Sequence, residues 1–233
     1  MVADAAGAPR RGRLITFEGP DGSGKSTQVA RLALRLEARG LPVVTTREPG
    51  GSPGADAIRH IVLSGAAEGL GVETEALLFA AARYDHVRTV IAPALRDGAF
   101  VLCDRFLDST RAYQGSVPGL DQTFLAELEA ATTSDVRPDL TLVLDVDSAV
   151  SQERISARRQ AEAADRFEKD GLDIHRRRRQ TFLEIAAREP DRCVVVAGGG
   201  SVDEISDRIE RIVVERFGLE GMPELGRRGG RST

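Results

Sequence analysis

One short segment of the chain has the residue types that hold a nucleoside triphosphate. Residues 19–27 read Gly-Pro-Asp-Gly-Ser-Gly-Lys-Ser-Thr and fit the phosphate-loop pattern G-x-x-x-x-G-K-[ST]. In such a loop the glycines turn backbone N–H groups toward phosphate, Lys25 adds a point charge and the Ser26 hydroxyl holds Mg²⁺. The predicted nucleotide-binding set is Gly19, Pro20, Asp21, Gly22, Ser23, Gly24, Lys25, Ser26 and Thr27.

The surroundings of this segment agree with the pattern. At the composition of this chain, roughly 0.002 matches are expected by chance over all start points. An apolar, strand-like run at 14–17 precedes the loop and a helix-like run at 28–39 follows it, which is the setting that a phosphate loop requires. Lys25 is also one of only two lysines in the chain.

Two further candidates follow predicted strands. Asp104 ends the apolar run 99–103, where a carboxylate suits a Mg²⁺ site, although a helix cap or a surface ion pair is the alternative. Arg47 follows a β-branched run at 42–46 and begins a loop broken by Pro and Gly. That loop is either part of a ligand-binding rim or a plain connector.

A predicted long helix brings a third group together. Phe79, Arg83 and His86 are spaced to share one face of a helix over residues 73–96. These three side chains on one face are a candidate site. The alternative is a core phenylalanine beside solvated polar groups.

Arginines gather in one polar segment in the second half of the chain. Arg154, Arg158, Arg159 and Arg166 surround residues 160–165, which carry little apolar side chain for packing. This segment either orders over an anion, as lids do, or is a solvated basic helix end. The longer run 176–179 is interpreted as the exposed turn of a helix over 171–188.

The alternation of apolar runs with helical stretches predicts an α/β fold. Strands are expected at 14–17, 42–46, 99–103, 140–146 and 193–196, and further helices at 54–66, 121–134, 148–159 and 201–217. Phosphate chemistry at the strand ends is typical of a doubly wound, five-stranded parallel sheet with helices on both faces. We assign residues 13–218 to one domain, and residues 1–12 and 219–233 to mobile ends.

Composition narrows the partners and the compartment. The formal net charge of −4 offers no general attraction for nucleic acid or an anionic membrane. No apolar run approaches the roughly 18 residues that span a bilayer. Cys103 and Cys193 lie in apolar runs, which indicates buried thiols and a reducing, cytoplasmic location.

Many arginines and few histidines favour phosphoryl transfer to an acceptor that is itself a phosphate. Such an acceptor is already nucleophilic near neutral pH, so the protein mainly aligns and neutralises two anions. The three histidines then need no catalytic role. A guanine-reading N-K-x-D motif is excluded because Lys169 follows Glu168 rather than Asn. A deoxynucleoside kinase and a non-catalytic nucleotide-binding regulator remain as alternatives.

Together these segments resemble the bacterial thymidylate kinase family, which phosphorylates dTMP to dTDP with ATP and Mg²⁺. The matching stretches are Phe17 to Thr27, Arg47 to Gly51, Leu78 to Arg83 with His86, Asp104 to Phe106, Ser109, Ala112 to Gly115, Pro138 to Leu140 and Asp165 to Glu168. The resemblance implies a P-loop, nucleoside monophosphate kinase-like fold with a lid over about residues 155–170. It also implies a homodimer, with the helix over 73–96 as the candidate interface.

The resemblance further implies roles for single residues. Phe79 would stack on thymine, Arg83 would bond its carbonyl edge and Tyr113 would crowd the sugar 2′ position. The implied dTMP-binding set is Asp21, Arg47, Phe79, Arg83, Arg105, Ser109, Tyr113 and Gln114; the catalytic set is Lys25, Arg105, Arg158, Arg159 and Arg166; the Mg²⁺ set is Ser26 and Asp104. Residues 20–23 contain no arginine, unlike the loop of some family members, so lid arginines would supply that charge.

Overall fold

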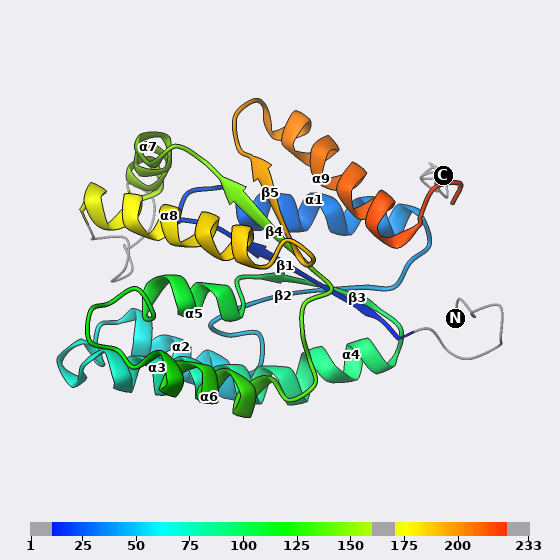
Figure 1. The fold of residues 1–233 in the computed structure, drawn as a ribbon. Coiled ribbons are helices and arrows are strands. Elements are labelled where there is room, and N and C mark those ends of the chain that lie inside the picture. The colour runs from blue at the N-terminus through cyan, green and yellow to red at the C-terminus, as the bar shows by residue number, and fades with distance from the viewer. Residues whose placement is uncertain (1–10, 160–170, 223–233) are drawn as a thin grey trace, which may run out of the picture.

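A computed structural model describes residues 11–159 and 171–222, and in these residues five strands form one sheet (Figure 1). The strands are β1 (Arg13–Glu18), β2 (Val43–Arg47), β3 (Phe100–Asp104), β4 (Leu140–Asp145) and β5 (Cys193–Ala197). They lie in the order β2-β3-β1-β4-β5, and every neighbouring pair is parallel. The predicted five-stranded parallel sheet is therefore confirmed.

Helices connect the strands and cover both faces of the sheet (Figure 1). They are α1 (Lys25–Ala38), α2 (Pro53–Leu63), α3 (Val72–His86), α4 (Ala92–Arg96), α5 (Leu107–Tyr113), α6 (Gln122–Thr133), α7 (Ser148–Arg159), α8 (Leu172–Arg188) and α9 (Val202–Phe217). The continuous helix predicted over 73–96 is instead divided by a π-helical turn at Val87–Ile91. Pro93 follows this turn and has no N–H for an α-helical hydrogen bond, which accounts for the local change in bonding.

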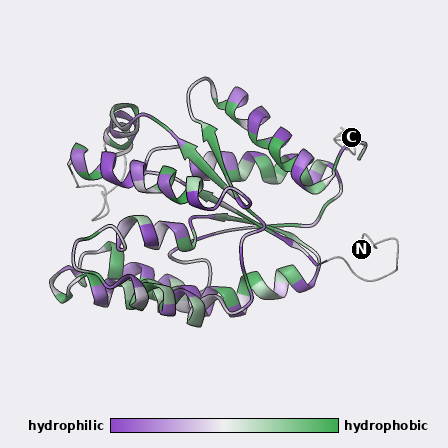
Figure 2. Ribbon diagram, in the orientation of Figure 1, coloured by the Kyte–Doolittle hydropathy of each residue, from purple (hydrophilic) through white to green (hydrophobic). Residues whose placement is uncertain are grey.

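The core forms on the two faces of the sheet because side chains alternate along each strand. Ile15 and Phe17 of β1 face α1 and α9, whereas Leu14 packs against the π-helical turn, α4 and the start of α5. On that second face, Val143 of β4 packs against Phe182 of α8. Figure 2 shows the central strands as predominantly hydrophobic, while the helices alternate between hydrophobic and hydrophilic residues. Fully burying a side chain such as Phe17 contributes about 1.5–3 kcal/mol.

The strand register brings the predicted site residues to one edge of the sheet. Asp104 pairs in register with Phe17 on one side and with Arg47 on the other. The carboxyl ends of β1, β2 and β3 therefore meet at the same level, as parallel strands require. The phosphate loop leaves β1 at this edge and α5 begins just after β3.

Parts of the predicted ends and lid lie outside the described residues, namely 1–10, 160–170 and 223–233. Leu219, which the sequence assigns to the C-terminal tail, is buried in the core cluster beneath α1 and α9. Among the described helices, none combines the length and apolar character needed to cross a membrane.

Candidate functional site

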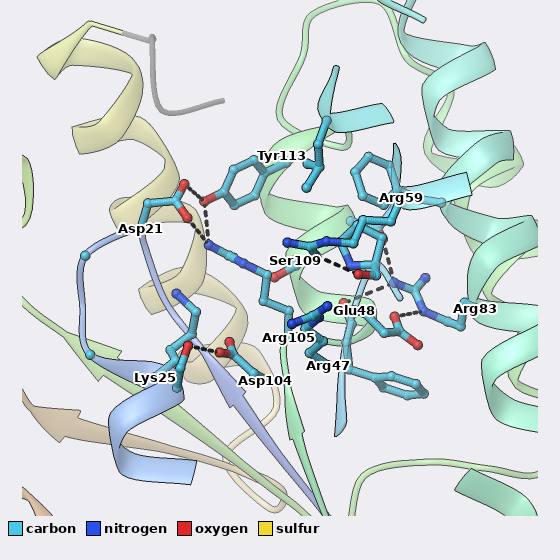
Figure 3. A pocket seen from close by; sticks show the side chains of 18 of the residues that line it. Asp21, Lys25, Arg47, Glu48, Arg59, Arg83, Asp104, Arg105, Ser109 and Tyr113 are labelled. Carbon is cyan, nitrogen blue, oxygen red and sulfur yellow. Dashed lines mark hydrogen bonds and ion pairs between the residues drawn. The ribbon is translucent and has the colours of Figure 1, made fainter. Parts of the chain in front are cut away.

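A cavity of about 410 Å³ opens at the carboxyl ends of β1, β2 and β3 (Figure 3). Its walls come from the phosphate loop, the loop after β2, helix α3 and the residues after β3. The predicted residues that line it are Asp21, Gly22, Gly24, Lys25, Ser26, Thr27, Arg47, Phe79, Arg83, Asp104, Arg105, Ser109, Tyr113 and Gln114. The fold thus brings the nucleotide-binding loop and the implied dTMP-binding set into one cavity.

Two glycines let the phosphate loop close tightly. Gly19 has a φ of 131°, and a Cβ there would lie 2.6 Å from the carbonyl oxygen of Leu144. Gly22 has a φ of 74°, and a Cβ there would lie 2.5 Å from the carbonyl oxygen of Ser151 in α7. A side chain at either position would clash with backbone, so the loop packs against β4 and α7 only with glycine.

Lys25 is buried inside this loop. Its Nζ donates hydrogen bonds to the carbonyl oxygens of Gly19 at 3.1 Å and Pro20 at 2.9 Å. Burial, and next the Arg105 charge, lower the pKa of Lys25 to about 8. Phosphate oxygens near Nζ would raise that pKa again, since an anion favours the charged ammonium.

Ser26 and Asp104 meet where α1 begins beside the end of β3. The Ser26 hydroxyl donates to Asp104 Oδ2 at 2.5 Å. Both groups offer oxygen, the ligand that Mg²⁺ prefers, and Mg²⁺ commonly keeps water and substrate phosphate as its other ligands. The described residues include no group of three or more His, Cys, Asp and Glu that could hold a metal. The two oxygens of this pair fit a Mg²⁺ ion that would take its other ligands from water and phosphate.

Arg105 lies at the centre of the cavity between the phosphate loop and α5 (Figure 3). Its Nη2 donates to Asp21 Oδ1 at 2.5 Å and to the Tyr113 hydroxyl oxygen at 3.0 Å. The Tyr113 hydroxyl in turn donates to Asp21 Oδ2 at 2.7 Å. Burial raises the pKa of Asp21, but the nearby charges of Arg105 and Lys25 outweigh burial and hold that pKa well below its usual range. Burial raises the pKa of Tyr113, so the phenol keeps its proton and remains a donor.

Glu18 fixes the turn that carries Arg105, and sequence reasoning assigned it no role. Its Oε1 accepts hydrogen bonds from the backbone N–H groups of Phe106 at 2.8 Å and Ser109 at 3.2 Å, and its Oε2 accepts from the Ser109 hydroxyl at 2.6 Å. Burial, and next the Asp108 charge, raise the pKa of Glu18 to about 7. These bonds anchor a turn in which Arg105 has a φ of 70°, a conformation that is uncommon outside glycine.

Glu48 holds Arg83, and its role was also missed. Arg83 Nε donates to Glu48 Oε2 at 2.7 Å, and Arg83 Nη2 donates to the Phe106 carbonyl oxygen at 3.1 Å and to Thr110 Oγ1 at 2.8 Å. Glu48 Oε1 also lies 3.1 Å from Nδ1 of His86. Arg83 is 3% exposed and His86 0%. The alternative of solvated polar groups on this helix face is therefore wrong.

Phe79 and Gln114 lie nearby. Phe79 of α3 is half-buried at the cavity wall. Gln114, at the end of α5, has its Nε2 3.5 Å from Oε2 of Glu75, which also belongs to α3.

Two more arginines line the cavity. Arg59 of α2, which the sequence did not single out, donates from Nη1 to the Pro49 carbonyl oxygen at 2.7 Å. Arg154 of α7 donates from Nη1 to the Gly22 carbonyl oxygen at 3.3 Å. The predicted lid roles of Arg158, Arg159 and Arg166 fall outside the described side chains.

The interpretation of residues 176–179 as an exposed turn is wrong for two of its members. Arg178 is 6% exposed, and its guanidinium carbon lies 4.2 Å from the centroid of the Tyr113 ring. Arg179 holds Asp145 at the end of β4 through Nε–Oδ1 at 2.5 Å and Nη2–Oδ2 at 3.0 Å. The physical reason is that α8 packs against both β4 and α5, so part of its polar sequence faces inward.

Known proteins resemble this chain along most of its length. The model of the thymidylate kinase family matches residues 17–209. A thymidylate kinase of Bradyrhizobium sp. (strain ORS 278) is 54% identical over 218 residues, which cover 93% of this chain and 96% of the relative. A thymidylate kinase of Afipia carboxidovorans is 53% identical over 209 residues, covering 90% and 92% respectively. The crystal structure of thymidylate kinase from Ehrlichia chaffeensis superposes with a TM-score of 0.70 and 33% identity, covering 87% of this chain and 99% of that one. The chain belongs to the thymidylate kinase family.

Proposed function

We infer that the protein is an enzyme that phosphorylates dTMP to dTDP with ATP. The observation that carries this inference is a single cavity with two different anion-binding ends. A phosphate-loop lysine lies at one end, and at the other an aromatic ring lies with several arginines around it. Family membership over most of the chain supports the same activity.

The donor nucleotide would bind at the phosphate loop. Backbone N–H groups of the loop after Pro20 and the Lys25 ammonium would surround its phosphates. Ser26 and Asp104 would hold Mg²⁺ directly or through water, and the metal would neutralise charge on the β- and γ-phosphates.

The acceptor dTMP would bind at the opposite end. Phe79 would stack on thymine, and Arg83 would bond its carbonyl edge through Nη1, for which the described residues contain no hydrogen-bond partner. Arg47 and Arg105 would bind the dTMP phosphate, and Asp21 and Tyr113 would lie along its sugar. Ser109 and Gln114 would complete the acceptor end.

The residues present suit transfer by positioning rather than by proton abstraction. The acceptor oxygen belongs to a phosphate, which needs no general base near neutral pH. Lys25 and Arg105 would instead neutralise the transferring group from two sides, and the barrier would fall through alignment and charge stabilisation.

We propose that one kinase domain spans residues 13–218 and that its lid spans about 155–170. Arg154 supports this proposal, because it directly precedes the predicted lid and already contacts the phosphate loop. We assign it a share of the lid charge proposed for Arg158, Arg159 and Arg166.

We also propose a cytoplasmic homodimer. Leu77 and Tyr84 on α3 are 47% and 43% exposed, and Ile61 on the neighbouring α2 is 44% exposed. Covering such apolar side chains favours association. The two buried, free cysteines suit a reducing compartment. Sedimentation of the Leu77→Glu variant should shift toward the monomer, and an unchanged dimer would exclude this interface.

The activity is tested by coupled detection of ADP with ATP, Mg²⁺ and a panel of acceptors. We expect dTMP to have a higher kcat/KM than AMP, CMP or GMP. Turnover of thymidine in place of dTMP would indicate a nucleoside kinase instead. Tight ATP binding without transfer to any acceptor would indicate a regulator.

A further inference from the structure

Tyr113 connects the acceptor end of the cavity to a helix that does not line it. The ring comes from α5, and its hydroxyl bonds both Asp21 and Arg105, as described above. Helix α8 packs beside α5 (Figure 1) but contributes no residue to the cavity wall. Where α8 packs against α5, it therefore reaches the cavity through the Tyr113 ring.

Two residues of α8 contact the Tyr113 ring. The guanidinium carbon of Arg178 lies 4.2 Å from the ring centroid, closer than the 5.0 Å of Arg105. Phe182, one turn later, meets the same ring edge-on with centroids 6.5 Å apart. Arg178 is 6% exposed and Phe182 is fully buried. The ring is thus covered by a desolvated cation and by an aromatic edge.

Arg178 brings a charge against the Tyr113 ring, which an aliphatic side chain would not do. An aliphatic side chain would fill the space between α8 and the ring without the cost of burying a charge. A planar guanidinium adds an attraction that depends on where the ring face lies, and this attraction is strongest when the cation is desolvated. Such a contact selects one orientation of the ring.

We propose that Arg178 is a positioning residue that fixes Tyr113 and thereby sets the preference of the site for 2′-deoxyribose over ribose. This inference rests on the proposed placement of the acceptor sugar beside Asp21 and Tyr113. A ring held in place keeps its hydroxyl on Asp21 and leaves no room for an additional 2′-hydroxyl. A ring that can turn accepts both sugars and aligns either one less well.

The test compares Arg178→Met, which keeps the length of the side chain but removes its charge, with Arg178→Lys, which keeps a cation. The exposed Arg176 of the same helix provides the control variant Arg176→Met. For each protein, kcat and KM are measured with dTMP and with the ribonucleotide that differs from it only by a 2′-hydroxyl.

We expect Arg178→Met to lower the deoxy-to-ribo ratio of kcat/KM about tenfold, mainly through a higher KM for dTMP and a lower KM for the ribonucleotide. Arg178→Lys should recover part of that ratio, and Arg176→Met should match the unmodified protein. An unchanged ratio in a folded Arg178→Met protein would overturn the inference. If that variant does not fold, an unchanged ratio in Arg178→Lys together with Arg178→Gln overturns it equally.

Tyr113→Leu separates this inference from the proposed sugar placement. If Tyr113→Leu leaves the ratio unchanged, the sugar does not lie against Tyr113 and the placement itself fails. If Tyr113→Leu lowers the ratio while Arg178→Met does not, only the role of Arg178 fails. When Tyr113→Leu is already present, adding Arg178→Met should change the ratio by less than about twofold, and a further tenfold loss would contradict action through the ring.

Discussion

Replacing Glu48 by alanine is expected to destabilise the protein strongly, because it leaves a buried guanidinium without its counterion. The side chains of Arg83 and Glu48 are 3% and 5% exposed, and their Nε–Oε2 distance is 2.7 Å. His86, which is 0% exposed, loses its contact with the same carboxylate. Water cannot replace these contacts without opening the packing between α3 and the loop after β2.

The expected loss in the free energy of unfolding follows from the burial of this ion pair. An exposed ion pair contributes about 0–1 kcal/mol, whereas removing one partner of a buried pair costs about 3–5 kcal/mol. Because a whole domain is typically stable by about 5–15 kcal/mol, the loss is a large part of the total. At about 2–4 °C per kcal/mol for a domain of this size, the Tm should fall on the order of 10 °C.

Urea denaturation of the ligand-free protein measures this effect through a double-mutant cycle. The four proteins are the unmodified chain, Glu48→Ala, Arg83→Met and the double variant. The stability loss of the double variant should be smaller than the sum of the two single losses by about 2 kcal/mol or more, since the double variant buries no unpaired charge. The exposed pair Arg176–Asp173 provides a control cycle with a coupling below about 0.5 kcal/mol. Additive losses at Glu48 and Arg83, within about 0.5 kcal/mol, would refute this reasoning.

Three other variants test the donor end and the turn after β3. Lys25→Ala should lower kcat about 100-fold or more in the coupled assay by removing charge stabilisation from the transferring group, and near-normal turnover would exclude that role. Asp104→Asn should raise the Mg²⁺ concentration for half-maximal velocity about tenfold while the KM for dTMP changes less than twofold, and an unchanged Mg²⁺ requirement would remove Asp104 from the metal site. The Glu18→Gln variant tests how the stability of the fold depends on pH. Because the pKa of Glu18 rises from 4.5 to about 7 on folding, the folded state keeps a proton that the unfolded chain releases, and stability falls as pH increases through this window. Between pH 5 and pH 7, the free energy of unfolding should decrease less for Glu18→Gln than for the unmodified protein. Equal decreases in the two proteins would contradict a buried, protonated Glu18.

Local patterns were sufficient to predict the sheet and the phosphate loop. Apolar runs of strand length alternate with helical stretches, and only a parallel sheet accommodates that order with short connections. The loop at 19–27 depends on glycines whose positive φ values are a local property of the chain. The position of Asp104 beside the phosphate loop was predicted because a carboxylate directly after an apolar strand must lie at the sheet edge.

The supporting charges could not be predicted because their partners are distant in sequence. Glu18 bonds residues 88 and 91 positions later, and Glu48 bonds an arginine 35 positions later. Hydropathy assigns such residues to the surface, as it did for Arg178. Their burial depends on how β1, α3 and α8 pack together, which no short window of sequence contains. Apolar residues directly beside Glu18, in Phe17 and Gly19, were the available indication that it is enclosed.

The two ends of the proposed acceptor site differ in how far they are organised before a ligand binds. At the base end, Arg83 is fixed by Glu48, Phe106 and Thr110, so the N–H donors of its Nη1 would meet a ligand at little cost in conformational freedom. At the phosphate end, Arg105 is occupied by Asp21 and Tyr113, and Lys25 by loop carbonyls, so incoming phosphates must compete with these internal partners. Transfer adds no net charge but redistributes it over the equatorial and bridging oxygens, so cations aimed at those oxygens would stabilise the transition state more than the ground state. In the proposed function, the base end would therefore mainly recognise the base, and the phosphate end would mainly set the rate of transfer.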